Sequence, residues 1–504
     1  MPTTFDPIDL EIRWRRLITM MDELDAAIVR TAFSTIVGES RDFAAILVDR
    51  HGRSLAQSQL STPAFTVTLP ITCKHFLRRF PADHLRPGDV LITNDPWLAS
   101  GHLPDLTICT PVFFHDRLVA FMGCTAHVSD IGGRIEYLDD RDLFEEGLRI
   151  PPSLLFQAGR RDETLFRLLE ANVRVPTLDL GDIYAITGAE ALGAKRLCEF
   201  LEDYAAPDLD DLADAILDRS EAVMRKAIAS LHPGRYECAL DVDGHREPVH
   251  IAVAVQVTPD SVVVDFTGSS AEREDSSINC VFNCTFADSY YPFKCSLIPD
   301  LPSNEGLLRP LSVYAPEGSI FNARFPRAVR SRSKTCFHIH AAIYGALAQA
   351  LPNRVQAGSG SFWSLTAYGA DAFGEPFRAH VLPNGGKGAV QGRDGLPAIA
   401  FPYNGTATPV EIFENSAPVL VERRELLPDS GGPGAYRGGM GQRLVLTARG
   451  EGPVHVFVRS DKLRFPAPGI LGGFPGHAGA VFMNGRATAP GALPLRPGDR
   501  LDLR

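Results

Sequence analysis

The sequence predicts a multi-domain α+β protein. Three observations support this: apolar residues at helical spacing, short apolar runs separated by turn residues, and a glycine-rich last third. A length of 504 residues is enough for about three domains. We expect an N-terminal α+β domain at 1–205, a central helix and sheet region at 206–352, and a β-rich C-terminal domain at 353–504.

Helices are expected where apolar residues recur every three or four positions. The first covers residues 8–30, where Leu17, Met21, Leu24 and Ile28 share one face and charged residues occupy the other. The same spacing predicts three further helices, at 179–204, 208–231 and 334–351. Pro352 ends the last of them, because the residue before a proline avoids the helical region.

Strands are expected where short apolar runs are bounded by Asp, Gly and Pro. In the first domain these runs are 43–48, 54–56, 90–93, 106–112 and 118–126. A strand pair follows at 250–257 and 262–266, joined by a turn at Pro259-Asp260. Beyond residue 355, glycine pairs such as Gly385-Gly386 and Gly438-Gly439 indicate many tight turns, which need a positive φ.

Charge and cysteine content exclude several classes of function. The net charge of −11 argues against a general nucleic-acid or anionic-membrane surface, since both require clustered Lys and Arg. No run approaches the ~20 apolar residues of a membrane-spanning helix. Nine cysteines without CxxC pairs indicate free thiols in a reducing cytoplasm. Two of them, Cys280 and Cys284, flank Asn283 and could lie near a site.

Two His-x-x-Asp units are the strongest candidates for chemistry. His102 and Asp105 form the first, and His127 and Asp130 follow 25 residues later, each unit at the boundary of a predicted strand. Upstream, the segment 39–42 adds two carboxylates directly before a strand. Imidazole and carboxylate ligands suit zinc, manganese or iron, and a bound cation with an open position activates water or polarises a carbonyl.

The same residues also allow a purely structural interpretation. Isolated His-x-x-Asp units arise by chance, and these spacings form no compact motif such as HExxH. Asp130, before Gly132-Gly133, suits a turn residue that accepts backbone N–H groups equally well. The cluster of Glu145, Glu146 and Arg149 could position a substrate or be a solvated group of charges. Phosphate-binding loops and the GxSxG elbow are absent from the sequence.

Taken in order along the chain, these motifs resemble the hydantoinase B family. That family includes the B subunit of N-methylhydantoinase, the B half of ATP-dependent 5-oxoprolinase and the α subunits of acetone-type carboxylases. The resemblance extends over nearly the whole chain. It is carried by Arg30-Thr31-Ala32-Phe33-Ser34, Glu39 with Asp42-Phe43, Asn94-Asp95-Pro96, His102-Leu103-Pro104-Asp105, Ala126-His127 with Asp130, Glu146-Gly147-Leu148-Arg149, Asp265-Phe266-Thr267-Gly268 and Asp429-Ser430-Gly431-Gly432.

The resemblance implies an N-terminal metal-binding domain in a hetero-oligomeric enzyme. An A-type partner would bind ATP and phosphorylate a cyclic amide such as a hydantoin, 5-oxoproline or a lactam, and this chain would complete the hydrolysis. By motif, His102, Asp105 and His127 would hold a divalent transition metal (zinc, manganese or iron), with Glu39 as fourth ligand. Asp42 and Asp130 would be catalytic carboxylates that orient ligands or water.

Two alternatives stay open. One is a subunit of an ATP-dependent acetone- or acetophenone-type carboxylase, and the other is a non-catalytic assembly subunit. The sequence also departs from the family at Phe65-Thr66-Val67-Thr68-Leu69-Pro70, where many members carry His-Leu-Gly-Ser-Met, and at Ala99-Ser100-Gly101 and Ala323. The lost histidine affects the expected substrate more than the expected metal.

Overall fold

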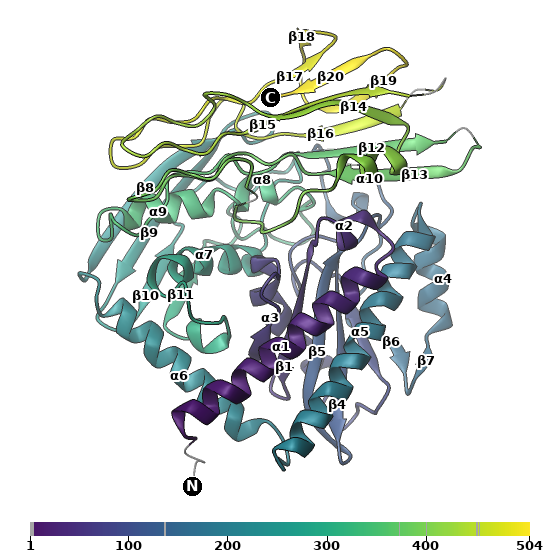
Figure 1. Ribbon diagram of the computed structural model, residues 1–504, viewed down its shortest axis with the longest axis vertical. Coiled ribbons are helices and arrows are strands. Elements are labelled where there is room, and N and C mark those ends of the chain that lie inside the picture. The colour runs from purple at the N-terminus through teal and green to yellow at the C-terminus, as the bar shows by residue number, and fades with distance from the viewer. Residues whose placement is uncertain (1–4, 136–137, 372, 400, 450–451, 453) are drawn as a thin grey trace.

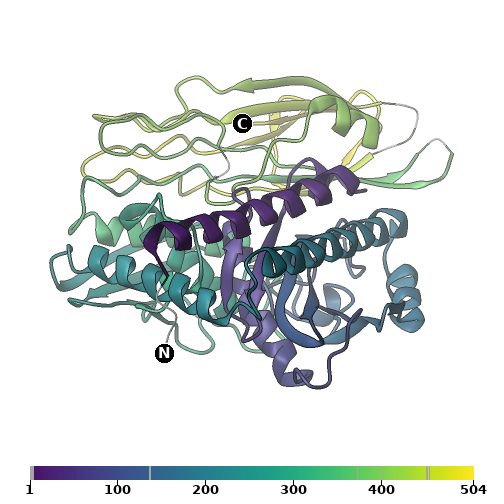
Figure 2. The ribbon, with the colours of Figure 1, turned by 60° about the horizontal axis from the view of Figure 1, so that its bottom comes forward.

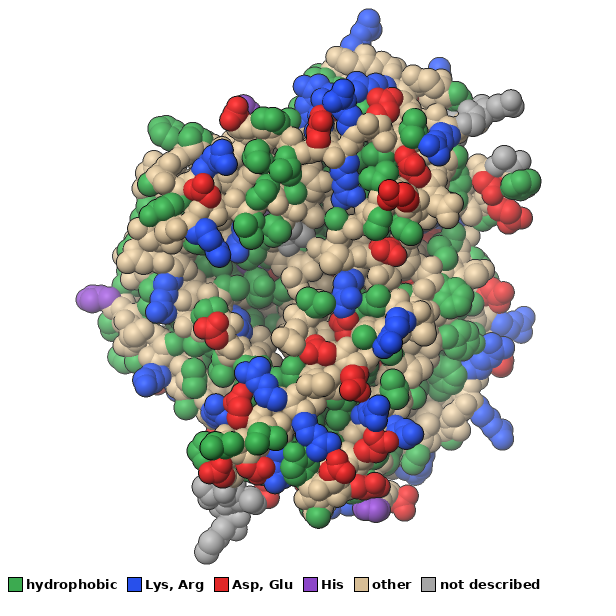
Figure 3. Space-filling view, viewed as in Figure 1, with side chains coloured by type: hydrophobic (Ala, Val, Ile, Leu, Met, Phe, Trp, Pro, Cys, Tyr) green, Lys and Arg blue, Asp and Glu red, His purple; other side chains and the backbone are tan. Residues whose placement is uncertain are grey.

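The computed structural model describes residues 5–135, 138–371, 373–399, 401–449, 452 and 454–504. Figure 1 shows the N-terminal and central parts below a glycine-rich C-terminal layer. Figure 2, turned by 60°, shows that layer lying across the long N-terminal helix. None of the helices in the described ranges is long and apolar enough to span a bilayer. Acidic and basic side chains are interspersed over the face drawn in Figure 3.

The N-terminal part is built on a seven-stranded antiparallel sheet of order β2-β1-β5-β4-β3-β6-β7. Helices α1 and α5 pack together on one face and α3 covers the other. Asp6 starts α1 by accepting from two backbone N–H groups, and Leu17, Met21 and Leu24 are buried. The elements are α1 (Pro7–Thr31), α2 (Thr35–Gly38), β1 (Phe43–Asp49), β2 (Ser54–Gln57), α3 (Pro63–Arg79), β3 (Val90–Thr93), β4 (Asp105–Phe114), β5 (Arg117–His127), η1 (Leu143–Glu145), β6 (Ser153–Gln157), β7 (Arg160–Arg161), α4 (Glu163–Asn172) and α5 (Pro176–Asp203).

The central part is a four-stranded sheet of order β11-β10-β9-β8, with β10 and β11 parallel. Helix α9 packs on β8 and β9, and α7 lies between α9 and α3. One apolar core runs from Leu10 to Val355, so the N-terminal and central parts share it. The elements are α6 (Asp210–Ile228), β8 (Gly234–Val242), β9 (Val249–Val257), β10 (Val262–Asp265), α7 (Phe282–Leu297), η2 (Glu305–Leu307), β11 (Leu311–Tyr314), α8 (Ser333–Cys336) and α9 (Ile339–Leu347).

The C-terminal part has its own core between two sheets, of order β13-β12-β16-β19 and β14-β15-β20-β17-β18. Its glycine-rich connections pack closely enough to exclude side chains: a Cβ at Gly386 would lie 1.8 Å from the carbonyl oxygen of Gly439. The elements are β12 (Ser364–Ala370), β13 (Pro376–Val381), α10 (Val410–Ser416), β14 (Val419–Leu426), β15 (Gln442–Ala448), β16 (Val454–Arg459), β17 (Val481–Met483), β18 (Arg486–Ala487), β19 (Gly491–Leu495) and β20 (Arg500–Leu503).

The structure corrects one predicted helix and contains several that were not predicted, among them α3 and α7. The stretch 334–351 is α8 and α9 separated by Phe337 and His338, and it ends at Leu347 rather than at residue 351. Helices α3 and α7 were not predicted. Both contain an internal proline, Pro70 and Pro292, and both are buried on several sides, so neither has a polar face to give the helical period.

Candidate metal centre

Strand register brings two of the candidate residues together. Strands β4 and β5 form a hairpin whose turn residues, His115 and Asp116, both have positive φ (46° and 61°), as a two-residue type I′ turn requires. With this turn, Asp105 at the start of β4 lies directly opposite His127 at the end of β5. Pairing of β1 with β5 brings Asp42 to the same edge, where its carbonyl accepts from the His127 N–H at 3.0 Å.

The side chains of His102, Asp105 and His127 converge on one carboxylate oxygen. Asp105 Oδ1 lies 2.7 Å from His102 Nε2 and 3.0 Å from His127 Nδ1. One ligand atom from each of the three lies within 4.8 Å of the others. The second oxygen, Asp105 Oδ2, accepts from the Ser100 hydroxyl at 2.6 Å and from the Arg332 guanidinium at 2.8 Å. Oδ1 is therefore the oxygen turned toward both imidazoles.

The environment makes this group suitable for a cation. His102 Nδ1 donates to the carbonyl of Arg330 at 2.9 Å, since a carbonyl can only accept. Burial, helped by Arg332, lowers the pKa of His102 to about 4, so its ring is neutral and Nε2 carries a lone pair. Burial opposes ionisation of Asp105, but His102 and Arg332 outweigh it and hold the pKa of Asp105 well below its usual range. A lone pair and an anionic oxygen then face each other at 2.7 Å, an arrangement that a metal ion satisfies.

Of the other expected site residues, Asp42 and Asp130 line the cavity and Glu39 does not. Asp42 is close: its Oδ2 lies 4.0 Å from His127 Nδ1, its Oδ1 is buried without a hydrogen-bond partner in the described parts of the chain, and burial raises its pKa to about 6. Glu39 is neither in the ligand group nor in the cavity wall. Helix α2 ends directly before Glu39 and the chain reverses at Arg41 (φ 54°), so Asp42 is carried to the sheet edge instead. Asp130 lines the cavity but pairs with Arg174 (2.8 Å) and Arg378 (3.4 Å).

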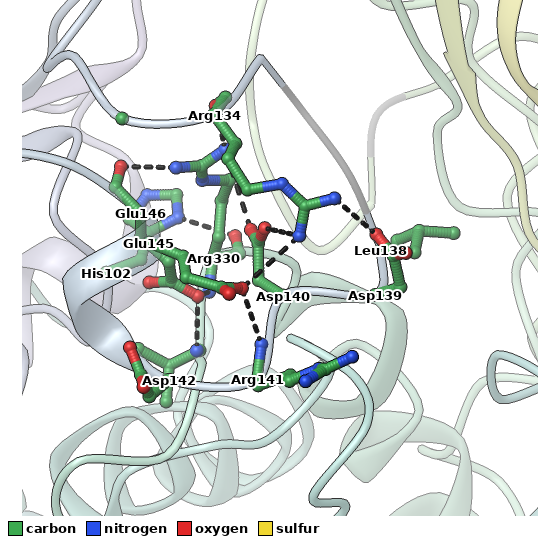
Figure 4. A network of polar contacts seen from close by, with 12 residues as sticks. His102, Arg134, Leu138, Asp139, Asp140, Arg141, Asp142, Glu145, Glu146 and Arg330 are labelled. Atoms are coloured by element: carbon green, nitrogen blue, oxygen red, sulfur yellow. Dashed lines mark hydrogen bonds and ion pairs between the residues drawn. The ribbon is translucent and has the colours of Figure 1, made fainter.

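A buried polar network fixes the loop that holds His102 (Figure 4). Glu146 Oε1 accepts from the backbone N–H groups of Val329 (2.6 Å) and Arg330 (2.7 Å). The Arg330 guanidinium donates in turn to the carbonyls of Arg134 and Glu146. Glu146 therefore supports His102 through the Arg330 backbone.

We expect Glu146→Ala to destabilise the protein and Glu146→Gln to be tolerated. Burial raises the pKa of Glu146 to about 8, so the group is a neutral acid at pH 7 and an amide is close to it in shape and charge. Alanine leaves two buried N–H groups unpaired, which costs about 2–4 kcal/mol of unfolding free energy. Urea unfolding of both variants measures this. Equal losses of unfolding free energy in the two variants would show that the acceptor oxygen of Glu146 does not account for the stabilisation.

The three residues open into a cavity of about 100 Å³. Its walls come from all three parts of the chain: the β4 and β5 ends, helices α7 to α9, and strands β12, β13 and β16. Five arginines line it (Arg134, Arg330, Arg332, Arg378 and Arg459), together with the apolar side chains of Phe65, Phe337 and Phe362. Phe65 lies where many family members carry the histidine noted above.

The sequence motifs predicted neither these arginines nor Cys336, which lines the same cavity. The arginines stand outside the His-x-x-Asp units, and an arginine without a motif is expected at the surface by default. Cys284 also lines the cavity, which agrees with the expectation that a cysteine beside Asn283 could lie near a site.

A second cavity, of about 230 Å³, lies among the glycine-rich C-terminal connections. It is lined largely by glycine and proline backbone, for example Gly385, Gly431 and Pro468. Although it is larger, it holds neither of the two side-chain groups that could ligate a metal within the described residues. The smaller cavity is therefore the better candidate for chemistry.

Comparison with known proteins gives the same family over the whole chain. The hydantoinase B/oxoprolinase profile matches residues 6–504. The B subunit of a putative D-/L-hydantoinase from Pseudomonas sp. (strain NS671) is 29% identical over 97% of this chain and 87% of its own length. The beta chain of the caprolactamase from Pseudomonas jessenii is 30% identical over 88% of this chain and 78% of its own. The 5-oxoprolinase 1 of Arabidopsis thaliana is 26% identical, and the match covers 95% of this chain but 39% of that protein.

Two solved structures share the fold of this chain. The ATP-dependent caprolactamase from Pseudomonas jessenii superposes with a TM-score of 0.89 at 26% identity, covering 99% of this chain and 90% of that one. Nucleotide-free acetone carboxylase gives 0.88 at 18% identity over 99% and 74%, which shows a shared fold alone. The chain belongs to the hydantoinase B/oxoprolinase family of enzymes.

Proposed function

We propose that this chain is the B-type component of an ATP-dependent cyclic-amide hydrolase and completes the opening of the ring. The observation that carries the proposal is the group of His102, Asp105 and His127 around one carboxylate oxygen, in a cavity lined with arginines. The family relatives support the substrate class, since they are named as hydantoinase, caprolactamase and 5-oxoprolinase.

An A-type partner would supply the ATP chemistry. The hydantoinase and caprolactamase relatives are the B and beta components of their enzymes, and this sequence has no phosphate-binding loop of its own. In this proposal the partner phosphorylates the amide oxygen, which removes the resonance that protects the amide and creates a leaving group. The intermediate then enters the cavity of this chain, where the guanidinium groups of Arg378 and Arg459 can contact its anionic oxygens.

His102, Asp105 and His127 would hold the divalent ion, with zinc, manganese and iron all compatible with two imidazoles and a carboxylate. A bound divalent ion lowers the pKa of water and polarises a carbonyl. Other residues of the chain position these ligands and accept the proton. Arg332 and Ser100 fix the Asp105 carboxylate, and the Arg330 carbonyl fixes the His102 tautomer. Asp42 Oδ1, which has no hydrogen-bond partner within 3.5 Å among the described residues, can accept a proton from the attacking water.

The test is a reconstituted reaction with the A-type partner. Hydantoin, 5-oxoproline and caprolactam are supplied singly with ATP, and ring-opened product and phosphate are measured. We expect ring opening to require ATP and both components. Added bicarbonate should not increase its rate. Carboxylated product that depends on bicarbonate would instead identify a carboxylase component.

We expect Asp42→Asn to lower turnover by about 100-fold or more in this assay, because an amide cannot accept the proton. Asp22→Asn is the matched control, since Asp22 is an aspartate of α1 whose carboxylate bonds to Gln59 outside the cavity. Wild-type turnover in the Asp42 variant would remove this residue from the mechanism.

A further inference from the structure

A second group of potential ligands lies in the wall of the same cavity as His102. Cys284 and Asp288 are four residues apart on α7, and Cys336 and His340 are four residues apart on the facing segment formed by α8 and α9. A spacing of four places Cys284 and Asp288 on one face of α7, whereas Cys336 ends α8 and His340 lies at the start of α9. All four side chains are buried, with 1%, 4%, 1% and 3% of their surface exposed. They come as two matched pairs on two packed helical segments.

Cys284, Asp288 and Cys336 lie at distances that suit ligands around one ion, and His340 lies beside one of them, Asp288. Cys284 Sγ lies 3.5 Å from Asp288 Oδ2, and His340 Nε2 lies 3.6 Å from Asp288 Oδ1. One ligand atom each from Cys284, Asp288 and Cys336 lies within 4.8 Å of the other two. In a tetrahedral zinc site with bonds of about 2.0–2.3 Å, neighbouring ligand atoms are about 3.3–3.8 Å apart.

Protein contacts alone leave the group poorly satisfied. The His340–Asp288 distance of 3.6 Å is too long for a hydrogen bond. The partner of Asp288 is a thiol, which is a weak donor. Burying a carboxylate costs several kcal/mol unless a strong donor or a cation compensates it. A divalent ion between the four side chains would provide that compensation.

We propose that Cys284, Asp288, Cys336 and His340 bind a second divalent ion, a zinc ion, in a site separate from that of His102, Asp105 and His127. Two sulfurs, one nitrogen and one oxygen form a closed tetrahedral set that zinc prefers. Two thiolates, a carboxylate and Zn²⁺ carry a net charge of −1, and the guanidinium of Arg332 lies beside Cys284, both of them bordering Gly101. The ion fastens α7 to α8 and α9, and thereby holds one wall of the cavity.

The experiment combines metal analysis with cobalt substitution of the full chain. The wild type is compared with Cys284→Ser/Cys336→Ser and with Cys198→Ser, a control whose half-buried thiol on α5 contacts the Phe113 carbonyl at 3.6 Å and does not line the cavity. We expect the double variant to lose about one equivalent of zinc per chain and the control to keep it. Cobalt in the wild type should give intense sulfur-to-cobalt charge-transfer absorption in the near ultraviolet, absent from the double variant.

Two further variants keep the test decisive if the double variant does not fold. His102→Ala/His127→Ala should retain the sulfur-to-cobalt absorption, because the two sites share no ligand, and Asp288→Asn should weaken zinc retention against a chelator by about 10-fold or more. Absence of the charge-transfer band from wild-type protein, or zinc retention unchanged by Asp288→Asn, would overturn the proposal. Neither readout depends on catalysis, so this site and the proposed function can fail separately.

Discussion

A protein in which His102 and His127 are both replaced by alanine is expected to lose the divalent ion that we propose they hold together with Asp105. The reason is geometric: the two imidazoles supply two of the three ligand atoms that meet at Asp105 Oδ1, at 2.7 and 3.0 Å. A single carboxylate, already bonded to Ser100 and Arg332 through its other oxygen, is a weak site for zinc, manganese or iron. We expect affinity to fall by at least about 1000-fold, because even the loss of a supporting residue costs 10–100-fold.

Inductively coupled plasma mass spectrometry of the dialysed protein measures this loss. His250→Ala is the matched control. His250 forms an exposed pair with Asp241 at 2.8 Å, so this substitution removes a His–Asp contact that lies outside the cavity. Metal content that is equal in the wild type and the double variant would show that these histidines are not ligands.

Glu190→Gln is expected to stabilise the protein at alkaline pH. Glu190 lies on α5 and is buried against the sheet, where Thr110 donates to its Oε2 at 2.6 Å and Oε1 has no partner in the described part of the chain. Burial raises its pKa from 4.5 to about 8. Between these values the unfolded chain releases a proton that the folded chain keeps. Stability is therefore greatest below about pH 4.5 for this group and falls as pH rises to about 8.

The size of the effect follows from the same titration. Each pH unit in that interval removes up to about 1.4 kcal/mol of unfolding free energy, so the loss by pH 8 is of the order of 3–5 kcal/mol. Glutamine does not ionise and abolishes this loss. Unfolding midpoints measured from pH 5 to pH 9 should therefore diverge in favour of the variant. Glu199→Gln, an exposed position on the same helix, should follow the wild type. If the unfolding midpoints of Glu190→Gln and the wild type changed in parallel with pH, this glutamate would be ionised in the folded protein.

The sequence predicted best those features that depend on neighbours along the chain. The apolar stripe of α1 and the strands β4 and β5 were predicted from local spacing, although the pairing of the two strands was not, and the motifs around His102 and His127 lie at the ends of those strands. Asp105 and His127 meet because an antiparallel register pairs them, and a short loop then brings in His102. The family resemblance, rather than the spacing alone, had grouped these three residues, which span 25 positions.

What could not be predicted depends on contacts between distant parts of the chain. Asp42 lies beside His127 while Glu39 does not line the cavity, and this depends on a chain reversal at Arg41, which has no strong sequence signal. Arg332, which fixes Asp105, comes from more than 200 residues away. Helix α7 carries Cys284 and Asp288, but its buried surroundings hide the helical period, so those residues could not be assigned to one face.

Ring opening by the complex of the A-type partner with the His102→Ala/His127→Ala variant tests the central claim most directly. We expect the variant chain still to assemble, since both histidines line the internal cavity rather than an outer surface that a partner could cover. Ring opening should be slower by at least about 1000-fold, while ATP hydrolysis by the partner continues. Ring opening at the wild-type rate in this variant would contradict the proposed mechanism and would leave the chain with an assembly role alone.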